Sequence, residues 1–102
     1  MYAAQSQITW WLDSGALPDR LVWARLSVSG DGSAEVLDCD GNYHRFENEQ
    51  AARLWLNEDE YSGLAHMIED GEVPSNLAPP NAPTDSELVK LMLVINAHGL
   101  SR

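Results

Sequence analysis

Residues 38–49, DCDGNYHRFENE, carry oxygen-bearing side chains at alternate positions and a glutamate at the twelfth place. Carboxylate and amide oxygens are the ligands that calcium prefers, and a short loop can gather several of them around one ion. The ligands of such a site would be Asp38, Asp40, Asn42 and Glu49. This stretch is therefore the first candidate for chemistry in the chain, and the alternative is a tight turn between two strands.

The spacing resembles the EF-hand calcium loop, but it departs from that loop where the geometry is most demanding. Tyr43 occupies the sixth position, where the sharp bend needs glycine, and Arg45 puts a cation where the family usually has an aliphatic residue. Residues 34–37, which precede the stretch, alternate like a strand, whereas an EF-hand loop follows a helix. Asp-Gly-Asn at 40–42 is typical of a hairpin turn. We therefore interpret residues 38–49 as a turn.

A second set of metal-ligating side chains lies in the acidic region 58–72. Asp59, His66, Glu69 and Asp70 combine three carboxylates with an imidazole, which suits a divalent ion. Positions 66 and 70 are four residues apart and would share one face of a helix. Carboxylates belong on helix surfaces in any case. A solvated polar face is therefore the favoured interpretation, and a divalent-metal site is the alternative.

Motifs for enzyme chemistry are absent from the sequence. Cys39 could pair with His44 or His66 as nucleophile and base, but a lone cysteine in an alternating strand is more often a small core residue. The single lysine, Lys90, follows a valine and not the glycine of a phosphate-binding loop. His-Glu-x-x-His and Gly-x-Ser-x-Gly do not occur. We therefore expect no enzymatic activity and no cofactor.

The composition narrows the class of partner. The chain has 102 residues, with 16 acidic and 6 basic side chains, a formal charge of -10, and no basic residue between Arg53 and Lys90. Such a field repels nucleic acids and anionic lipids and attracts basic protein surfaces. One cysteine suits a reducing compartment, and no apolar run approaches the roughly 18 residues needed to span a bilayer. Met1 is not followed by a basic signal-peptide region. We expect a single cytoplasmic domain, residues 1–102.

Strands are predicted in the first half of the chain. Residues 20–28 alternate between two faces, residues 34–39 alternate again after the turn Ser-Gly-Asp-Gly, and residues 43–46 follow a second turn. These three segments predict an antiparallel meander at about 20–46. Residues 4–14 fit both the helical and the strand period, and we favour a helix that ends near Gly15 and Pro18.

Helices are predicted in the second half. Asn48 can cap a helix that continues to about residue 70, as one bent helix or two short ones. Residues 71–83 contain four prolines and predict an extended connector. Thr84 and Glu87 form a capping box for a helix over 85–98 that is apolar on nearly every side. The predicted fold is α+β, with a three-stranded meander packed on one face against two or three helices.

These features together favour a non-enzymatic protein-interaction domain that acts as an adaptor or regulator. The apolar last helix is expected to contact a partner protein or a second copy in a homodimer. Trp10 and Trp11 cannot both point the same way, so one is a candidate contact at the edge of the interface and the alternative places both in two local clusters. The predicted partner-binding residues are Trp10, Trp11, Leu88, Leu91, Met92 and Ile95. The alternative functions are an acidic mimic of nucleic acid, which inhibits a basic nucleic-acid-binding protein, and a divalent-metal-binding protein.

The turn interpretation predicts that residues 38–49 bind no calcium tightly. Calorimetric titration of the protein with calcium at neutral pH should show no binding heat. A dissociation constant in the micromolar range or below, abolished by Asp38→Ala and Glu49→Ala, would establish a calcium loop instead.

Overall fold

The computed structural model describes residues 7–17 and 19–95, the last of these by its backbone only, and it confirms the α+β prediction. Its antiparallel sheet has six strands, so the predicted three-stranded meander is only part of it. The strands in sheet order are β4 (Tyr43–Phe46), β3 (Ala34–Leu37), β2 (Arg20–Val28), β1 (Gln7–Asp13) and β5 (Tyr61–Gly63), and β6 (Leu93–Ile95) pairs with β2 outside this path. Three α-helices and one 3-10 helix complete the described part of the chain.

The first element is a strand, and the helix predicted over residues 4–14 is therefore wrong for the described residues. β1 (Gln7–Asp13) pairs with β2 (Arg20–Val28) in antiparallel register, with Trp10 opposite Arg25 and Leu12 opposite Trp23. The structure therefore follows the two-residue strand period, which the alternation of Ile8, Trp10 and Leu12 shows, and not the helical period. The short 3-10 helix η1 (Ser14–Ala16) follows, and the Asp13 carboxylate caps it by accepting the Gly15 N–H at 2.9 Å.

The predicted meander is confirmed as β2, β3 (Ala34–Leu37) and β4 (Tyr43–Phe46). The two strands β3 and β4 are joined by the turn at Asp38–Asn42. Asp38 closes that turn, because its Oδ1 accepts the N–H groups of Asp40 and Asn42 at 2.9 and 3.0 Å. Gly41 has φ +88°, a conformation that glycine adopts without strain.

The helical region 48–70 consists of two short helices with a strand between them. α1 (Glu49–Glu58) begins at Asn48, whose side chain accepts the Ala51 N–H at 2.8 Å, as the capping pattern predicts. The chain then reverses at Glu60, which has φ +67°. β5 (Tyr61–Gly63) pairs with the end of β1, and α2 (Leu64–Glu69) starts directly after Gly63.

The last predicted helix begins where expected but ends early. Residues 71–83 form a connector without helix or strand, and Thr84 caps α3 (Asp85–Leu91). The chain then becomes β6 (Leu93–Ile95), so the predicted helix is wrong for residues 93–95, and residues 96–98 of that prediction lie outside the described residues. β6 pairs with Arg20–Val22 of β2, next to the part of β2 that pairs with β3. Backbone groups of β2 that β3 leaves without a partner thus draw this segment into the sheet.

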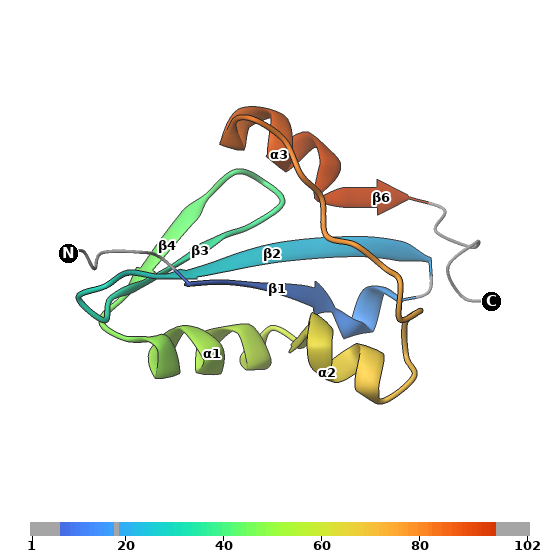
Figure 1. Cartoon of the computed structure of the whole chain (residues 1–102), viewed down its shortest axis with the longest axis horizontal. Coiled ribbons are helices and arrows are strands. Elements are labelled where there is room, and N and C mark those ends of the chain that lie inside the picture. Colours follow the sequence, from blue (N-terminus) through green and yellow to red (C-terminus); the bar gives the residue numbers. More distant parts are fainter. Residues whose placement is uncertain (1–6, 18, 96–102) are drawn as a thin grey trace.

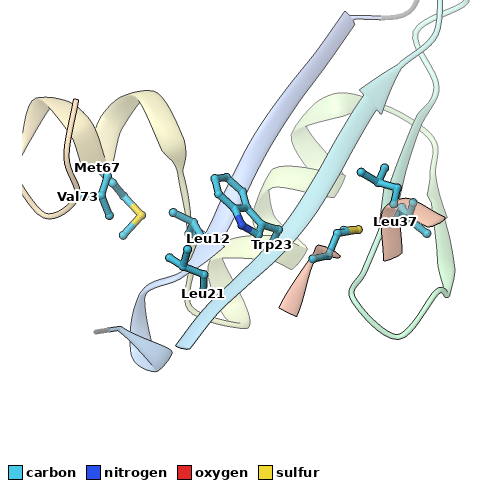
Figure 2. Packing of buried hydrophobic residues seen from close by; sticks show 8 residues of the cluster. Leu12, Leu21, Trp23, Leu37, Met67 and Val73 are labelled. Atoms are coloured by element: carbon cyan, nitrogen blue, oxygen red, sulfur yellow. The ribbon is translucent and has the colours of Figure 1, made fainter. Parts of the chain in front are cut away.

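Helices cover both faces of the sheet, not one face as predicted (Figure 1). α1 packs against one face through Ala52 and Leu56. The opposite face lies under α3 and the connector, and Figure 2 shows Leu12, Leu21 and Trp23 grouped on β1 and β2, with Met67 and Val73 to one side. The buried residues of this second cluster are Leu12, Leu21, Trp23, Leu37, Met67, Val73, Leu88 and Met92. Among the described residues, no helix is long and apolar enough to cross a membrane.

The cap of α3 predicts a measurable loss on mutation. The Thr84 hydroxyl accepts the Glu87 N–H at 3.2 Å, so Thr84→Ala should lower the free energy of unfolding by about 1 kcal/mol. Chemical denaturation measures this difference. Thr84→Ser retains the hydroxyl and should recover most of it, whereas equal losses in both variants would mean that the cap is not the cause.

Candidate functional site

Two of the four candidate calcium ligands, Asp38 and Glu49, make local side-chain contacts. Asp38 accepts the N–H groups of Asp40 and Asn42 in the turn, and its Oδ2 also contacts His44 Nε2 at 2.7 Å. Burial alone would raise the pKa of Asp38, but the hydrogen bonds from His44 and the turn N–H groups hold the pKa below its usual value. Glu49 lies in the first turn of α1 and forms an ion pair with Arg53 at 2.6 Å.

The four candidate metal ligands lie around the ends of two helices. Asp59 follows α1, Glu69 ends α2 and Asp70 is the C-cap of α2. The structure brings two of the four together, since His66 Nε2 lies 3.3 Å from Asp70 Oδ2. In residues 7–17 and 19–95, no group of three or more His, Cys, Asp or Glu side chains is placed to hold a metal ion.

Cys39 lies at the margin of the core, next to the turn after β3. Its side chain is half-buried against the second cluster. Burial is the main cause that raises the pKa of the Cys39 thiol, and the nearby Asp40 and Asp38 carboxylates raise it further. A raised pKa keeps the thiol protonated near neutral pH, which is the opposite of what activates a cysteine nucleophile.

The two adjacent tryptophans take part in the two different clusters, as the alternative interpretation anticipated. Trp10 packs edge-on against Trp23, with ring centroids 5.9 Å apart and planes at 89°. Trp11 is buried on the α1 face, where the Arg53 guanidinium lies 5.3 Å from its ring centroid. Trp11 Nε1 also donates to the Thr9 hydroxyl at 3.1 Å. Trp10 therefore is the member of the pair that is less deeply buried.

The other predicted partner-binding residues separate into buried and exposed positions. Leu88 and Met92 are buried in the chain's own core. Leu91 is 47% exposed, and Leu93 and Val94 beside it are also exposed. The side chain of Ile95 lies outside the described part of the structure. Of the predicted set, Leu91 and the half-buried Trp10 are the described side chains that reach the surface.

A hollow of about 350 Å³ lies beside the first half of β1. It exists because β5 pairs with Trp11–Asp13 only, and the chain turns away after Gly63 to form α2. Ile8, at its margin, is 53% exposed although it sits on a strand. The lining residues are Ile8, Thr9, Trp10, Trp11, Arg53 and residues 63–66.

A second hollow, of about 430 Å³, lies on the face of the sheet that α3 covers. Ile8, Trp10, Arg25 and Leu88 line it together with residues 79–82 of the connector. The two hollows share Ile8 and Trp10, so they meet at these side chains. We call the combined area, formed by Ile8, Trp10, residues 63–66 and residues 79–82, the Ile8–Trp10 surface.

An ion pair holds α3 against the sheet beside the second hollow. Arg25 binds Asp85 with two parallel hydrogen bonds, Nη1 to Oδ1 at 3.0 Å and Nη2 to Oδ2 at 3.1 Å. The Tyr43 hydroxyl also donates to Asp85. These contacts, first from Arg25 and then from Tyr43, lower the pKa of Asp85 below its usual value. Because Asp85 begins α3, the pair fixes the helix that carries Leu88.

Sequence reasoning found Trp10 but missed Ile8, Gly63 and the connector residues 79–82. The signal for Ile8 was present, because Ile8, Trp10 and Leu12 alternate. Nothing in the sequence marked Gly63, whose role comes from the point at which β5 ends.

The Arg25–Asp85 pair predicts a pH dependence. A carboxyl whose pKa is lower in the folded state stabilises the fold above its unfolded pKa of about 4, and the contribution is lost as the pH falls through the folded value. Asp85→Asn should therefore lower the free energy of unfolding by about 1 kcal/mol at pH 7. The difference from the native chain should shrink below about pH 4. Urea denaturation between pH 2 and 7 measures both effects.

Glu35→Gln is the matched control for this test. Its partner Arg45 has a side chain that is 83% exposed, so this variant should be nearly neutral. A pH-independent loss in Asp85→Asn would assign the effect to the helix start and not to the ion pair.

The candidate site is thus a mainly apolar surface beside β1, whose second edge is only partly paired by the residues that the structure describes. Comparisons of the chain with models of known protein families, with curated proteins and with solved structures found no match.

Proposed function

We propose that the protein is a non-enzymatic interaction domain that binds another protein at the Ile8–Trp10 surface. The observation that supports this proposal is the position of Ile8, which is 53% exposed between two hollows of about 350 and 430 Å³. An exposed aliphatic side chain alone is ordinary, but one that joins two hollows offers a partner apolar area and shape.

The residues of this surface suit protein recognition. Trp10 is of the type that often dominates binding energy, and its ring is already held in place by Trp23. A side chain that is ordered before binding loses little conformational entropy when a partner contacts it. Residues 79–82, with two adjacent prolines, add a wall of restricted backbone freedom.

The charge of the chain favours a basic partner. Arg25, Arg45 and Arg53 each form an ion pair with a carboxylate, so three of the few positive charges are neutralised locally. With 16 acidic side chains, the remaining field is negative and accelerates the approach of a basic chain. The Ile8–Trp10 surface would then provide the apolar contact, and the negative field would favour basic partners over acidic ones.

Selection from a random peptide library tests the proposal. Immobilised protein should enrich linear peptides, and fluorescence anisotropy then measures their dissociation constants. Ile8→Ser should weaken the enriched peptides about tenfold, the effect expected for loss of an important apolar contact. Leu54→Ser is the matched control, because Leu54 is 57% exposed on α1 and lines neither hollow, and it should leave binding unchanged.

Three other results would contradict the proposed surface. Equal loss in both variants would indicate a general effect on the fold. Binding that disappears in high salt but ignores Ile8→Ser would favour a mimic of nucleic acid, which binds through carboxylates. A concentration-dependent dimer that is abolished by Leu91→Ser would move the contact to the exposed side chains of Leu91, Leu93 and Val94, near the homodimer contact proposed for residues 85–98.

A further inference from the structure

We infer that the partner binds as an extended, basic segment that adds a strand to the free edge of β1, antiparallel to β1 and in line with β5. This inference rests on the proposed function and specifies the conformation and chemistry of the partner. It follows from the pairing of β1, the direction of its backbone groups, the place of the hollow and the charge of the chain.

The edge of β1 is only half used in the described structure. β2 pairs with Gln7–Leu12 on one side, whereas β5 pairs with Trp11–Asp13 on the other. Residues 7–10 therefore have a strand neighbour on one side only within the described part of the chain. A strand edge of this kind is a template for a further strand.

Two hydrogen bonds show which backbone groups face the free side. The Ser14 N–H donates to the Glu60 carbonyl at 2.9 Å, and Ser14 lies opposite Glu60 in the register that pairs Asp13 with Tyr61. The backbone N–H and C=O groups of the even-numbered residues of β1 therefore point to the side of β5. The Trp23 N–H donates to the Met92 carbonyl at 2.8 Å, on the side of β2 away from β1. The backbone N–H and C=O groups of the even-numbered residues of β2 therefore point toward β1. Their partners in β1 are odd-numbered, such as Trp11 opposite Ala24. The N–H and C=O groups of Ile8 and Trp10 therefore point to the free side.

The first hollow lies where a continuation of β5 would run. Its lining combines residues 8–11 of β1 with Gly63, the last residue of β5, and with the first residues of α2. A Cβ added at Gly63 would meet nothing within 4 Å, which independently shows open space at this point. The described chain thus leaves open space beside residues 8–11 of β1, where such a segment would lie.

Residues 7–10 carry none of the usual protection of a free edge against strand addition. Natural proteins block free edges with charged residues or proline, yet residues 7–10 are Gln-Ile-Thr-Trp. The edge strand at the opposite end of the sheet, β4, carries Arg45 with a side chain that is 83% exposed. This contrast indicates that the edge of β1 at residues 7–10 is available for pairing with a further strand.

The geometry specifies the sequence pattern of the partner. Residues directly opposite Ile8 and Trp10 would lie on the same face as these side chains and should be apolar. The same residues exchange the backbone hydrogen bonds with β1, because opposite residues of a hydrogen-bonded pair do so. The intervening positions should carry lysine or arginine, since the chain has a formal charge of -10 and Glu49 already pairs with Arg53, the arginine that lines the first hollow.

A synthetic nonapeptide of alternating lysine and valine is the probe. Fluorescence anisotropy should detect binding to the native chain, and the glutamate-valine analogue should bind at least about tenfold more weakly because of like-charge repulsion. N-methylation of the two central valines removes donors to β1 and should weaken binding roughly tenfold. N-methylation of the two neighbouring lysines should have a small effect, because their N–H groups point away from β1.

Two variants of Ile8 separate backbone from side chain on the protein itself. Ile8→Ala retains the outward N–H, whereas Ile8→Pro also removes it, and proline is tolerated on an edge strand when its position faces outward. Ile8→Pro should bind the lysine-valine peptide roughly fivefold more weakly than Ile8→Ala, the effect of one lost hydrogen bond. Thermal melting compares the two folds. The N-methylated peptides keep the test decisive if Ile8→Pro does not fold.

Each remaining outcome has a defined reading. Equal effects of valine and lysine methylation would overturn strand addition. In that case the proposed function would still stand if the library peptides remained sensitive to Ile8→Ser. If the library peptides bound but the lysine-valine peptide did not, the inference would be overturned and the proposed function would again stand. Equal affinity for the glutamate analogue would overturn the basic partner. A dimer in sedimentation equilibrium that Ile8→Pro abolishes would identify a second copy as the occupant and overturn the inference.

Discussion

The structure depends on hydrogen-bond partners for both edges of β2, the longest of the described strands. β1 occupies one edge, and the other is shared between β3, which pairs with Arg25–Val28, and β6, which pairs with Arg20–Val22. The Trp23 N–H, between these two partners, donates to the Met92 carbonyl at 2.8 Å. A buried backbone group without a partner is costly. This requirement ends α3 early and draws the last described segment into the sheet.

The same requirement is met less completely at β1. β5 contributes three residues before the chain departs as α2, and it departs because Leu64, Met67 and Ile68 have apolar contacts to make in the core. The core is thereby completed at the expense of strand pairing. An exposed isoleucine and the hollow of about 350 Å³ result, and they lie on the side of β1 that β5 leaves without a partner among the described residues. The end of β5 at Gly63 thus determines both the packing of α2 in the core and the open surface beside β1.

Charge and apolar area have separate roles in the proposed recognition. The Arg25–Asp85 pair is structural, because it fixes α3 over the sheet beside the second hollow. Most of the acidic side chains have no such role among the described ion pairs and set the long-range field. Such a field fades over about 10 Å at ordinary salt, whereas apolar contact does not depend on salt in this way. Binding at the Ile8–Trp10 surface would therefore keep a salt-resistant component.

The sequence by itself determined what local rules control: the alternation of residues 20–28, the turn closed by Asp38, and the caps at Asn48 and Thr84. These depend on contacts between residues close in the chain. Only the tertiary structure decided that residues 7–13 form a strand and that residues 93–95 leave the helix, because both choices depend on free edges of distant β2. Trp10 could be proposed from its type, but Ile8 and Gly63 could not, since their importance comes from where β5 stops and open space begins.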